Sequence, residues 1–291
     1  MKEWGRLITA MITPFDQDLN VNYSKAVELA KKLVDEGTTA LVISGTTGEA
    51  PTLTDEEKCE LFRILKREVN VPIIAGIGTN NTRATIELGK KAVDCGVDGA
   101  LVVVPYYNKP NQEGLYAHFK AVAEEVDLPI MLYNVPSRTG GNMTAETSIA
   151  LSKIPNIVAL KESAGDLDQT TKVVEGCSED FLVYSGDDSL LLPTLCVGGY
   201  GVVSVASHVV GPQISNMIDA YLAGNYKEAA KIHQRLSGIF EALFITTNPI
   251  PVKAALNILG LEVGGLRLPL VEADSKVKDR LKVEMEKLGI L

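Results

Sequence analysis

A single lysine stands at the end of a buried apolar segment in this chain of 291 residues. Lys161 directly follows the apolar run 157–160 (IVAL), which predicts a buried strand. Burying an unpaired ammonium group is costly, and a desolvated amine gives up its proton more readily than a hydrated one. Such a lysine can attack a carbonyl carbon and form a Schiff base. The alternative is a side chain that leaves the sheet and places its ammonium group in solvent.

Polar residues follow other apolar segments in the same way. The loop 45–49 (GTTGE) carries Thr46 and Thr47 between two glycines, so backbone N–H groups and two hydroxyls are available for a carboxylate or phosphate. A plain tight turn is the other interpretation. Tyr107 follows a fourth segment, and the sequence 133–140 (YNVPSRTG) places Tyr133 and Arg138 at the end of a fifth. Tyrosines often serve packing alone, whereas an arginine can bind a carboxylate through paired hydrogen bonds.

Two further loops carry weaker signals. The sequence 185–188 (SGDD) contains Gly186, where a substrate could approach the backbone, and its aspartates could instead cap the following helix. The sequence 76–81 (GIGTNN) begins like a dinucleotide-binding loop but has Asn81 where the third glycine belongs. We interpret it as a strand-to-helix turn.

Eight short apolar runs, separated by helical patterns, supply the elements that would position these residues. Because the runs are continuously apolar, both faces of each strand should be covered, as in a parallel sheet. Eight β-α repeats within about 210 residues predict a closed (β/α)8 TIM barrel, an α/β fold whose active site lies at the carboxyl ends of the strands. The predicted strands are Leu7–Thr13, Ala40–Ser44, Val71–Ala75, Ala100–Val104, Ile130–Asn134, Ile157–Lys161, Phe181–Ser185 and Gly201–Val205.

The rest of the chain predicts helices only. Residues 212–291 show no further strand pattern and predict three or four helices. We therefore expect a catalytic barrel over residues 1–224 and a small C-terminal helical extension over residues 225–291. Among the helix signals, Thr54 and Glu57 form a capping box, and Gly37 predicts the end of the first helix.

The composition and the apolar segments argue against nucleic-acid-binding, membrane-spanning and metal-binding proteins. The net charge of −9 argues against a broad nucleic-acid or anionic-membrane surface. No apolar run reaches the roughly 18 residues that a membrane-spanning helix needs, and residues 1–12 do not resemble a signal peptide. The four cysteines and three histidines show no metal-ligand spacing. We expect a cytoplasmic enzyme without a metal site.

Together these residues suit condensation of a 2-oxo acid with an aldehyde. Lys161 would form the imine, and loss of a neighbouring proton would give an enamine that attacks the aldehyde. Tyr133 is the best-placed proton shuttle, and Thr46 could bridge it to Tyr107. The 46–47 loop would bind the keto-acid carboxylate and Arg138 a second carboxylate. The route requires no metal and no organic cofactor.

The motifs GTTGE, PYY, YNVPSRTG, LKE and SGDD, with 248–253 (NPIPVK) and 266–269 (LRLP), resemble the pyruvate-dependent class I aldolases, which include the N-acetylneuraminate lyases. Within them the chain is most similar to the dihydrodipicolinate synthase family, over essentially its whole length. The resemblance implies that pyruvate condenses with L-aspartate 4-semialdehyde in the first committed step of diaminopimelate and lysine biosynthesis.

The resemblance also implies residue roles. Lys161 forms the Schiff base, Tyr133 relays protons with Thr46 and Tyr107, and Thr47 and the Val203 carbonyl contact pyruvate. Arg138 binds the carboxylate of the semialdehyde, and Gly186 lies in the same pocket. The tyrosine matching Tyr107 enters the neighbouring subunit's site in the family, which implies a homotetramer built from tight dimers.

The sequence leaves two alternative functions open. A related aldolase acting on a 2-keto-3-deoxy sugar acid is disfavoured by Arg138, because a neutral sugar aldehyde offers no carboxylate. A catalytically inactive barrel would be expected to lose Lys161 or Tyr133. The resemblance does not carry lysine feedback inhibition over, because Asp55, Lys58 and Ala84 depart from the inhibited pattern, although Asn80 and Tyr106 match it.

Overall fold

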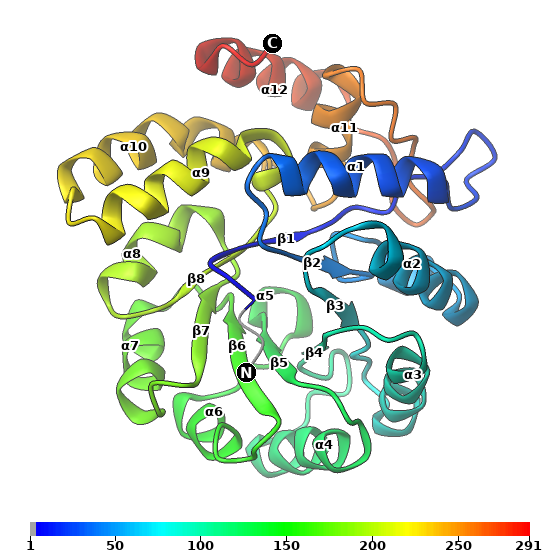
Figure 1. Ribbon diagram of the computed structural model, residues 1–291, viewed down its shortest axis with the longest axis vertical. Coiled ribbons are helices and arrows are strands. Elements are labelled where there is room, and N and C mark those ends of the chain that lie inside the picture. Colours follow the sequence, from blue (N-terminus) through cyan, green and yellow to red (C-terminus); the bar gives the residue numbers. More distant parts are fainter. Residues whose placement is uncertain (1–3) are drawn as a thin grey trace.

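The chain forms a closed barrel of eight parallel strands surrounded by helices (Figure 1). The computed structural model describes residues 4–291. Neighbouring strands in the barrel are consecutive in the sequence, and β8 pairs with β1 to close it. The predicted TIM barrel is confirmed. The strands are β1 (Leu7–Ala10), β2 (Ala40–Ile43), β3 (Ile73–Gly76), β4 (Gly99–Val103), β5 (Ile130–Asn134), β6 (Ile157–Glu162), β7 (Leu182–Ser185) and β8 (Gly201–Ser204).

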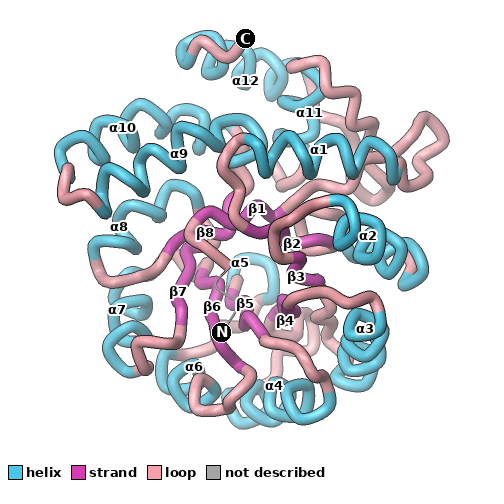
Figure 2. Tube along the Cα trace, viewed as in Figure 1, coloured by secondary structure: helices cyan, strands magenta, loops and turns pink. Residues whose placement is uncertain are grey.

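Helices cover the outside of the barrel (Figure 2). Most follow a strand and lead back to the start of the next one, as the repeat predicted. The short helix α5 instead lies across one end of the barrel, directly after β5. All the helices of the described residues are α1 (Tyr23–Asp35), η1 (Ala50–Thr52), α2 (Asp55–Glu68), α3 (Thr82–Asp94), α4 (Gln112–Glu125), α5 (Pro136–Thr139), α6 (Ala145–Leu151), α7 (Leu167–Gly176), η2 (Asp188–Leu190), α8 (Leu191–Cys196), α9 (Ser207–Leu222), α10 (Tyr226–Ala242), α11 (Ile250–Ile258) and α12 (Ser275–Leu288).

Most strand ends differ from the predicted ones by no more than one residue, and two differ by more. β1 ends at Ala10, three residues before the predicted end at Thr13. β3 begins at Ile73 rather than Val71, because Pro72 has no N–H group for the ladder and contributes only its carbonyl, which accepts from Leu41 N. The local helix signals are confirmed: the capping box of Thr54 and Glu57 opens α2, and Gly37 follows α1 with a φ of 99°.

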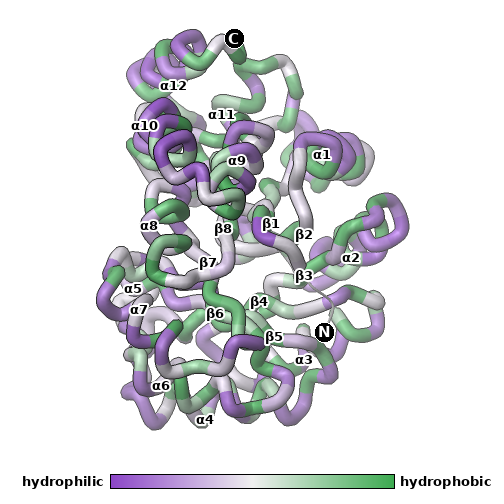
Figure 3. The backbone as a smooth tube through the Cα atoms, turned by 60° about the vertical axis from the view of Figure 1, so that its left-hand side comes forward, coloured by the Kyte–Doolittle hydropathy of each residue, from purple (hydrophilic) through white to green (hydrophobic). Residues whose placement is uncertain are grey.

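Two hydrophobic clusters stabilise the fold. The larger one lies between the strands and the surrounding helices. The smaller one fills the barrel interior with residues that alternate along the strands, such as Met131 and Tyr133 on β5. Trp4 belongs to this interior cluster, although nothing in its sequence context predicted it. Figure 3 shows the hydrophobic stretches along the strands and the alternation of hydrophobic and hydrophilic residues along α10 and α12.

The last helices extend the molecule to one side of the barrel (Figure 1). α10 packs on α9 and on α12, and α11 packs on α9 and α12. The expected boundary between residues 224 and 225 falls in the turn that joins α9 to α10. The division into two parts stays a prediction, since the helices on both sides of this turn pack together. Among the described helices, none has the length and apolar character needed to cross a membrane.

Candidate active site

Lys161 and Tyr133 lie side by side in the barrel. They are register partners on β6 and β5, and the Lys161 Nζ atom lies 4.3 Å from the centre of the Tyr133 ring. Each residue is only 5% exposed. Side chains alternate between the two faces of a strand, and Ala159, two residues before Lys161, belongs to the interior cluster. The lysine therefore points into the barrel, and the solvent-exposed alternative is wrong.

Gly186 keeps the space beside Lys161 open. A Cβ atom at this position would lie 2.9 Å from Lys161 Cε and 1.9 Å from the hydroxyl oxygen of Ser163. The Gly186 N–H donates to the Glu162 carbonyl at 2.7 Å, so the β7 loop passes close to the end of β6. Only glycine fits here without displacing the lysine side chain.

The GTTGE loop follows β2 as a compact turn. The Gly48 and Glu49 N–H groups donate to the Gly45 and Thr46 carbonyls, both at 3.1 Å. Thr46 is half-buried, whereas Thr47 is buried and its Oγ1 accepts a hydrogen bond from Asn248 at 2.9 Å. The loop is therefore held from inside the protein, with Thr46 on its more open side.

Arg138 lies on the short helix α5, directly after β5. It is exposed, and its Nη2 donates to the Asn248 carbonyl at 3.3 Å. Asn248 thus contacts both the Thr47 hydroxyl and Arg138. No role for Asn248 was predicted, and its only signal in the sequence is its place in the motif NPIPVK.

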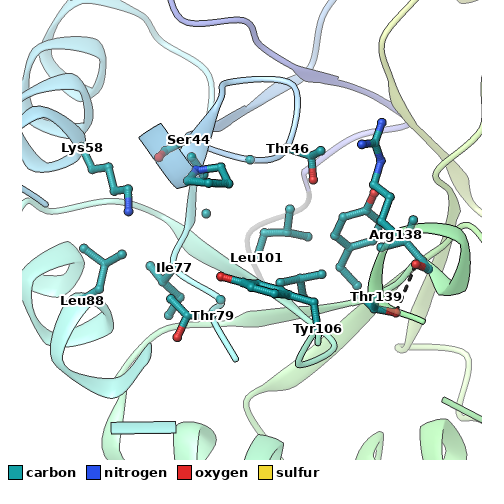
Figure 4. Close-up of a pocket in the computed structure, with 18 residues that line it drawn as sticks. Ser44, Thr46, Lys58, Ile77, Thr79, Leu88, Leu101, Tyr106, Arg138 and Thr139 are labelled. Carbon is teal, nitrogen blue, oxygen red and sulfur yellow. Dashed lines mark hydrogen bonds between the residues drawn. The ribbon is translucent and has the colours of Figure 1, made fainter. Parts of the chain in front are cut away.

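A cavity of about 430 Å³ opens at this end of the barrel. Figure 4 shows Thr46 and Arg138 on one side of it, Tyr106 in the middle, and Lys58 and Leu88 on the other side. Of the predicted site residues, Thr46, Tyr133 and Arg138 line the cavity. The lining residues are Ser44, Gly45, Thr46, Ala50, Pro51, Lys58, Gly76, Ile77, Gly78, Thr79, Leu88, Leu101, Val103, Tyr106, Tyr133, Val135, Arg138 and Thr139.

The other predicted residues lie outside the set that lines this cavity. Lys161 does not line the cavity itself, but its amine lies against the ring of Tyr133, which does. Val203 is fully buried in β8 and belongs to the interior cluster. Tyr107 is 88% exposed and has a φ of 73°, so its side chain is not part of the cavity of its own chain. Its neighbour Tyr106 lines the cavity instead.

Buried carboxylates surround the strand ends without entering the cavity. Glu162 accepts hydrogen bonds from Asn134, the Ala164 N–H and Gln169. Burial raises the pKa of the Glu162 carboxyl, and these hydrogen bonds oppose the rise. In the sequence Glu162 stands out only as the neighbour of Lys161, because its hydrogen-bond partner Asn134 is distant in the chain.

The two aspartates after β7 have different roles. The Asp187 side chain accepts from the Ser189 N–H and caps η2, as one of the two interpretations of SGDD proposed. Asp188 is fully buried and accepts from the Ser204 hydroxyl and from the N–H groups of Val205 and Ala206. Burial raises the pKa of its carboxyl. Asp188 thus joins the end of β7 to the end of β8.

The GIGTNN sequence is a strand-to-helix turn, as predicted. The Asn81 side chain accepts from the N–H groups of Arg83 and Ala84 and caps α3. A Cβ atom at Gly76 or Gly78 would lie 2.2 or 2.3 Å from the neighbouring backbone, so these glycines allow close packing of loops. Within residues 4–291, no group of three or more His, Cys, Asp and Glu side chains is arranged to hold a metal ion.

Comparison with known proteins finds one family that matches almost the whole chain. The model of the dihydrodipicolinate synthetase family matches residues 3–288. A 4-hydroxy-tetrahydrodipicolinate synthase from Moorella thermoacetica is 53% identical over 291 residues, covering 99% of this chain and 100% of that protein. One from Heliobacterium modesticaldum is 56% identical over 290 residues, with 99% and 97% covered.

Solved structures give the same result. The crystal structure of a dihydrodipicolinate synthase from Cyanidioschyzon merolae with lysine bound has a TM-score of 0.98 and 51% identity, covering 99% of both chains. A dihydrodipicolinate synthase from Bacillus anthracis has a TM-score of 0.96 and 49% identity, with 98% and 99% covered. On sequence and fold together, this chain belongs to the dihydrodipicolinate synthetase family.

Proposed function

We propose that this chain condenses pyruvate with L-aspartate 4-semialdehyde to give 4-hydroxy-tetrahydrodipicolinate, with Lys161 as the nucleophile. The curated relatives over the full length carry the name of that activity. The observation that supports Lys161 best is its position: a buried amine in a barrel mouth, next to a tyrosine on the adjacent strand. The sugar-acid alternative receives no support from the relatives.

The proposed condensation proceeds through a Schiff base on Lys161. The Lys161 amine attacks the pyruvate carbonyl, and water leaves to give an imine. A proton lost from the methyl group gives an enamine, whose carbon forms a bond to the aldehyde carbon of the semialdehyde, and the aldehyde oxygen becomes a hydroxyl. The substrate's amino group then attacks the imine carbon, closes the ring and releases the lysine amine. This lyase chemistry draws on protein groups alone, so we propose no metal or organic cofactor.

Proton transfer requires a group within reach of Lys161. We assign this role to Tyr133, since its ring is the neighbour of the lysine amine. Thr46, which lines the same cavity as Tyr133, would continue the relay. Tyr107 would complete it from a neighbouring subunit, because it is turned away from its own cavity.

Two anion sites are needed, one for each substrate carboxylate. The loop with Thr47 offers backbone N–H groups for pyruvate, and the Val203 carbonyl and the space left by Gly186 would lie beside the bound substrate. Arg138 would bind the carboxylate of the semialdehyde by charge-assisted hydrogen bonds. Among the described residues, the Arg138 side chain donates one hydrogen bond, to the Asn248 carbonyl. Most of its N–H donors are therefore available to a substrate carboxylate.

We also propose a homotetramer built from tight dimers, and a cytoplasmic location in keeping with a biosynthetic reaction. The exposed Tyr107, held at a positive φ that is unusual for a tyrosine, supports the tight dimer. One solved relative, 41% identical with a TM-score of 0.96, is described as a monomeric variant, so assembly varies in the family. Light scattering of the purified protein measures the mass of the assembly. The Tyr107→Phe variant should have lower activity and the same assembly mass as the wild type.

The experiment for Lys161 is reductive trapping. The protein is incubated with pyruvate and borohydride, and the adduct is mapped by mass spectrometry. We expect one label, on Lys161, and none in a Lys161→Met variant. A label on another lysine, or no label, would refute the mechanism. Rates with the semialdehyde and with sugar aldehydes then separate this activity from the sugar-acid alternative.

A further inference from the structure

A buried ion pair joins the GTTGE loop to helix α11. The Lys253 Nζ atom lies 2.6 Å from Glu49 Oε1, and each side chain is 1% exposed. Glu49 is the last residue of the loop that carries Thr46 and Thr47, and Lys253 belongs to the C-terminal helices. The pair therefore connects a loop at the active-site end of the barrel with a segment outside the eight β-α repeats.

Both ions have further partners that fix their positions. Glu49 Oε2 accepts from the Arg267 N–H at 3.0 Å. The Lys253 ammonium donates to the Gly265 carbonyl at 2.7 Å and lies 4.0 Å from the centre of the Phe15 ring. Burial lowers the pKa of Lys253 to about 8, and the Glu49 carboxylate opposes this shift. Glu49 itself adopts a φ of 56°, a left-handed conformation that its surroundings must hold in place.

The same C-terminal region contacts the loop at two more points. The Asn248 side chain donates to Thr47 Oγ1 at 2.9 Å. Arg267 donates to the Thr52 carbonyl at 2.8 Å and forms an ion pair with Glu57 of α2 at 2.6 Å. We call Asn248, Lys253 and Arg267 the C-terminal clamp. The clamp contacts the segment 47–57 at the loop itself, at η1 and on α2.

We propose that Lys253 is a positioning residue, which acts through Glu49 to hold the 46–47 loop ready for the substrate carboxylate; this inference rests on the proposed function. Backbone N–H groups bind an anion well only when they are already oriented, because ordering a loop on binding costs affinity. A buried ion pair is weak evidence for stability, since apolar residues of similar size often stabilise as well. Directional contacts to a substrate-binding loop give this pair a different purpose.

The test compares Lys253→Met with a control variant. The control is Lys66→Met, which removes a 2.6 Å ion pair to the buried carboxylate of Asp98 at the other end of the barrel, just before β4. Hydrogen–deuterium exchange of the segment 44–53 measures the order of the loop. The KM for pyruvate measures the function of the loop. The maximal rate is divided by the number of sites that borohydride can trap.

We expect faster exchange in the segment 44–53 of Lys253→Met, and a KM for pyruvate raised by about tenfold, which corresponds to about 1.4 kcal/mol of lost binding. The maximal rate per trappable site should change less. The Lys66→Met protein should match the wild type in both measurements. Unchanged exchange in Lys253→Met would overturn the positioning role, and faster exchange with an unchanged KM would overturn its link to substrate binding.

A second variant separates positioning from stability. Lys253→Met leaves the Glu49 carboxylate buried without its cation, so it lowers stability and the folded yield. The double variant Glu49→Gln/Lys253→Met removes that unpaired charge and should recover stability. Its KM for pyruvate should remain raised, because the loop is still released from α11. Recovery of the KM together with stability would count against the proposal.

Failure of the proposed function would look different. In that case the wild type would not be trapped by pyruvate and borohydride at Lys161. The exchange measurement does not depend on that reaction, so it still decides whether Lys253 orders the loop.

Discussion

The Asn134 amide donates to both carboxylate oxygens of Glu162, at 3.0 and 3.2 Å. The two residues are register partners on β5 and β6, and each directly follows a residue of the interior pair, Tyr133 and Lys161. Because side chains alternate across a strand, the Asn134–Glu162 contact lies on the outer face of the barrel, behind the proposed nucleophile and its proton shuttle. The contact joins the two strands where their inner faces must stay aligned.

We expect Glu162→Gln to destabilise the fold by roughly 1–3 kcal/mol, because a buried donor then faces the Asn134 amide and cannot be satisfied. Urea unfolding measures the loss. The double variant Asn134→Asp/Glu162→Gln exchanges acid and amide and should lose less than the sum of the two single variants. Additive losses would show that the two side chains do not act as a pair.

Gly186→Ala should slow imine formation by roughly a hundredfold, because the new Cβ would displace the Lys161 side chain from its working position. The rate of adduct formation with pyruvate and borohydride measures the effect. Gly141→Ala is the matched control, since a Cβ atom there has no heavy atom within 4 Å. Equal rates in the two variants would contradict the close packing of Gly186 against Lys161.

Arg138→Ala should impair use of the semialdehyde far more than imine formation with pyruvate. Loss of charge-assisted hydrogen bonds to a carboxylate, about 1.5–3 kcal/mol, corresponds to an increase of roughly 10- to 100-fold in the KM for the semialdehyde. Arg138→Lys keeps the charge but not the forked geometry, so an intermediate KM is expected. If the trapping rate with pyruvate falls as much as turnover does, Arg138 has another role.

The fold should lose stability between pH 7 and pH 5 through His208. This imidazole is fully buried, its Nδ1 donates to the Val205 carbonyl and its Nε2 accepts from the Ile12 N–H, so the folded chain requires the neutral ring. Burial lowers its pKa from 6.5 to about 4, and the Lys32 charge adds to this shift.

Because the pKa of His208 is lower in the folded chain, the unfolded chain binds the proton at a higher pH. The contribution of His208 to stability is therefore fully present above pH 6.5 and is lost as the pH falls toward 4. Between pH 7 and pH 5 the contribution is about 2 kcal/mol, from 1.36 kcal/mol for each pH unit below 6.5. Urea unfolding at both pH values measures it. His208→Gln should reduce the difference between the two pH values, and an unchanged difference would assign the effect to other groups.

The sequence by itself determined the barrel and much of its catalytic rim. Eight apolar runs of strand length specify eight buried strands. In a closed (β/α)8 barrel consecutive strands are neighbours, so the ends of β5 and β6 lie side by side. The position of Tyr133 beside Lys161 is therefore specified by the order of the strands along the chain. Local signals worked for the same reason: a capping box or a terminal glycine acts within one helical turn.

The contacts between distant segments were decided only by the tertiary structure. The Glu49–Lys253 ion pair, the bridge from Asn248 to Thr47 and the burial of Trp4 in the barrel join parts of the chain that no periodicity relates. A sequence pattern reports which face of an element is apolar, but not which distant element will cover it. Pairing of buried polar groups is settled when the chain packs, because each group must then find a partner among those that burial places beside it.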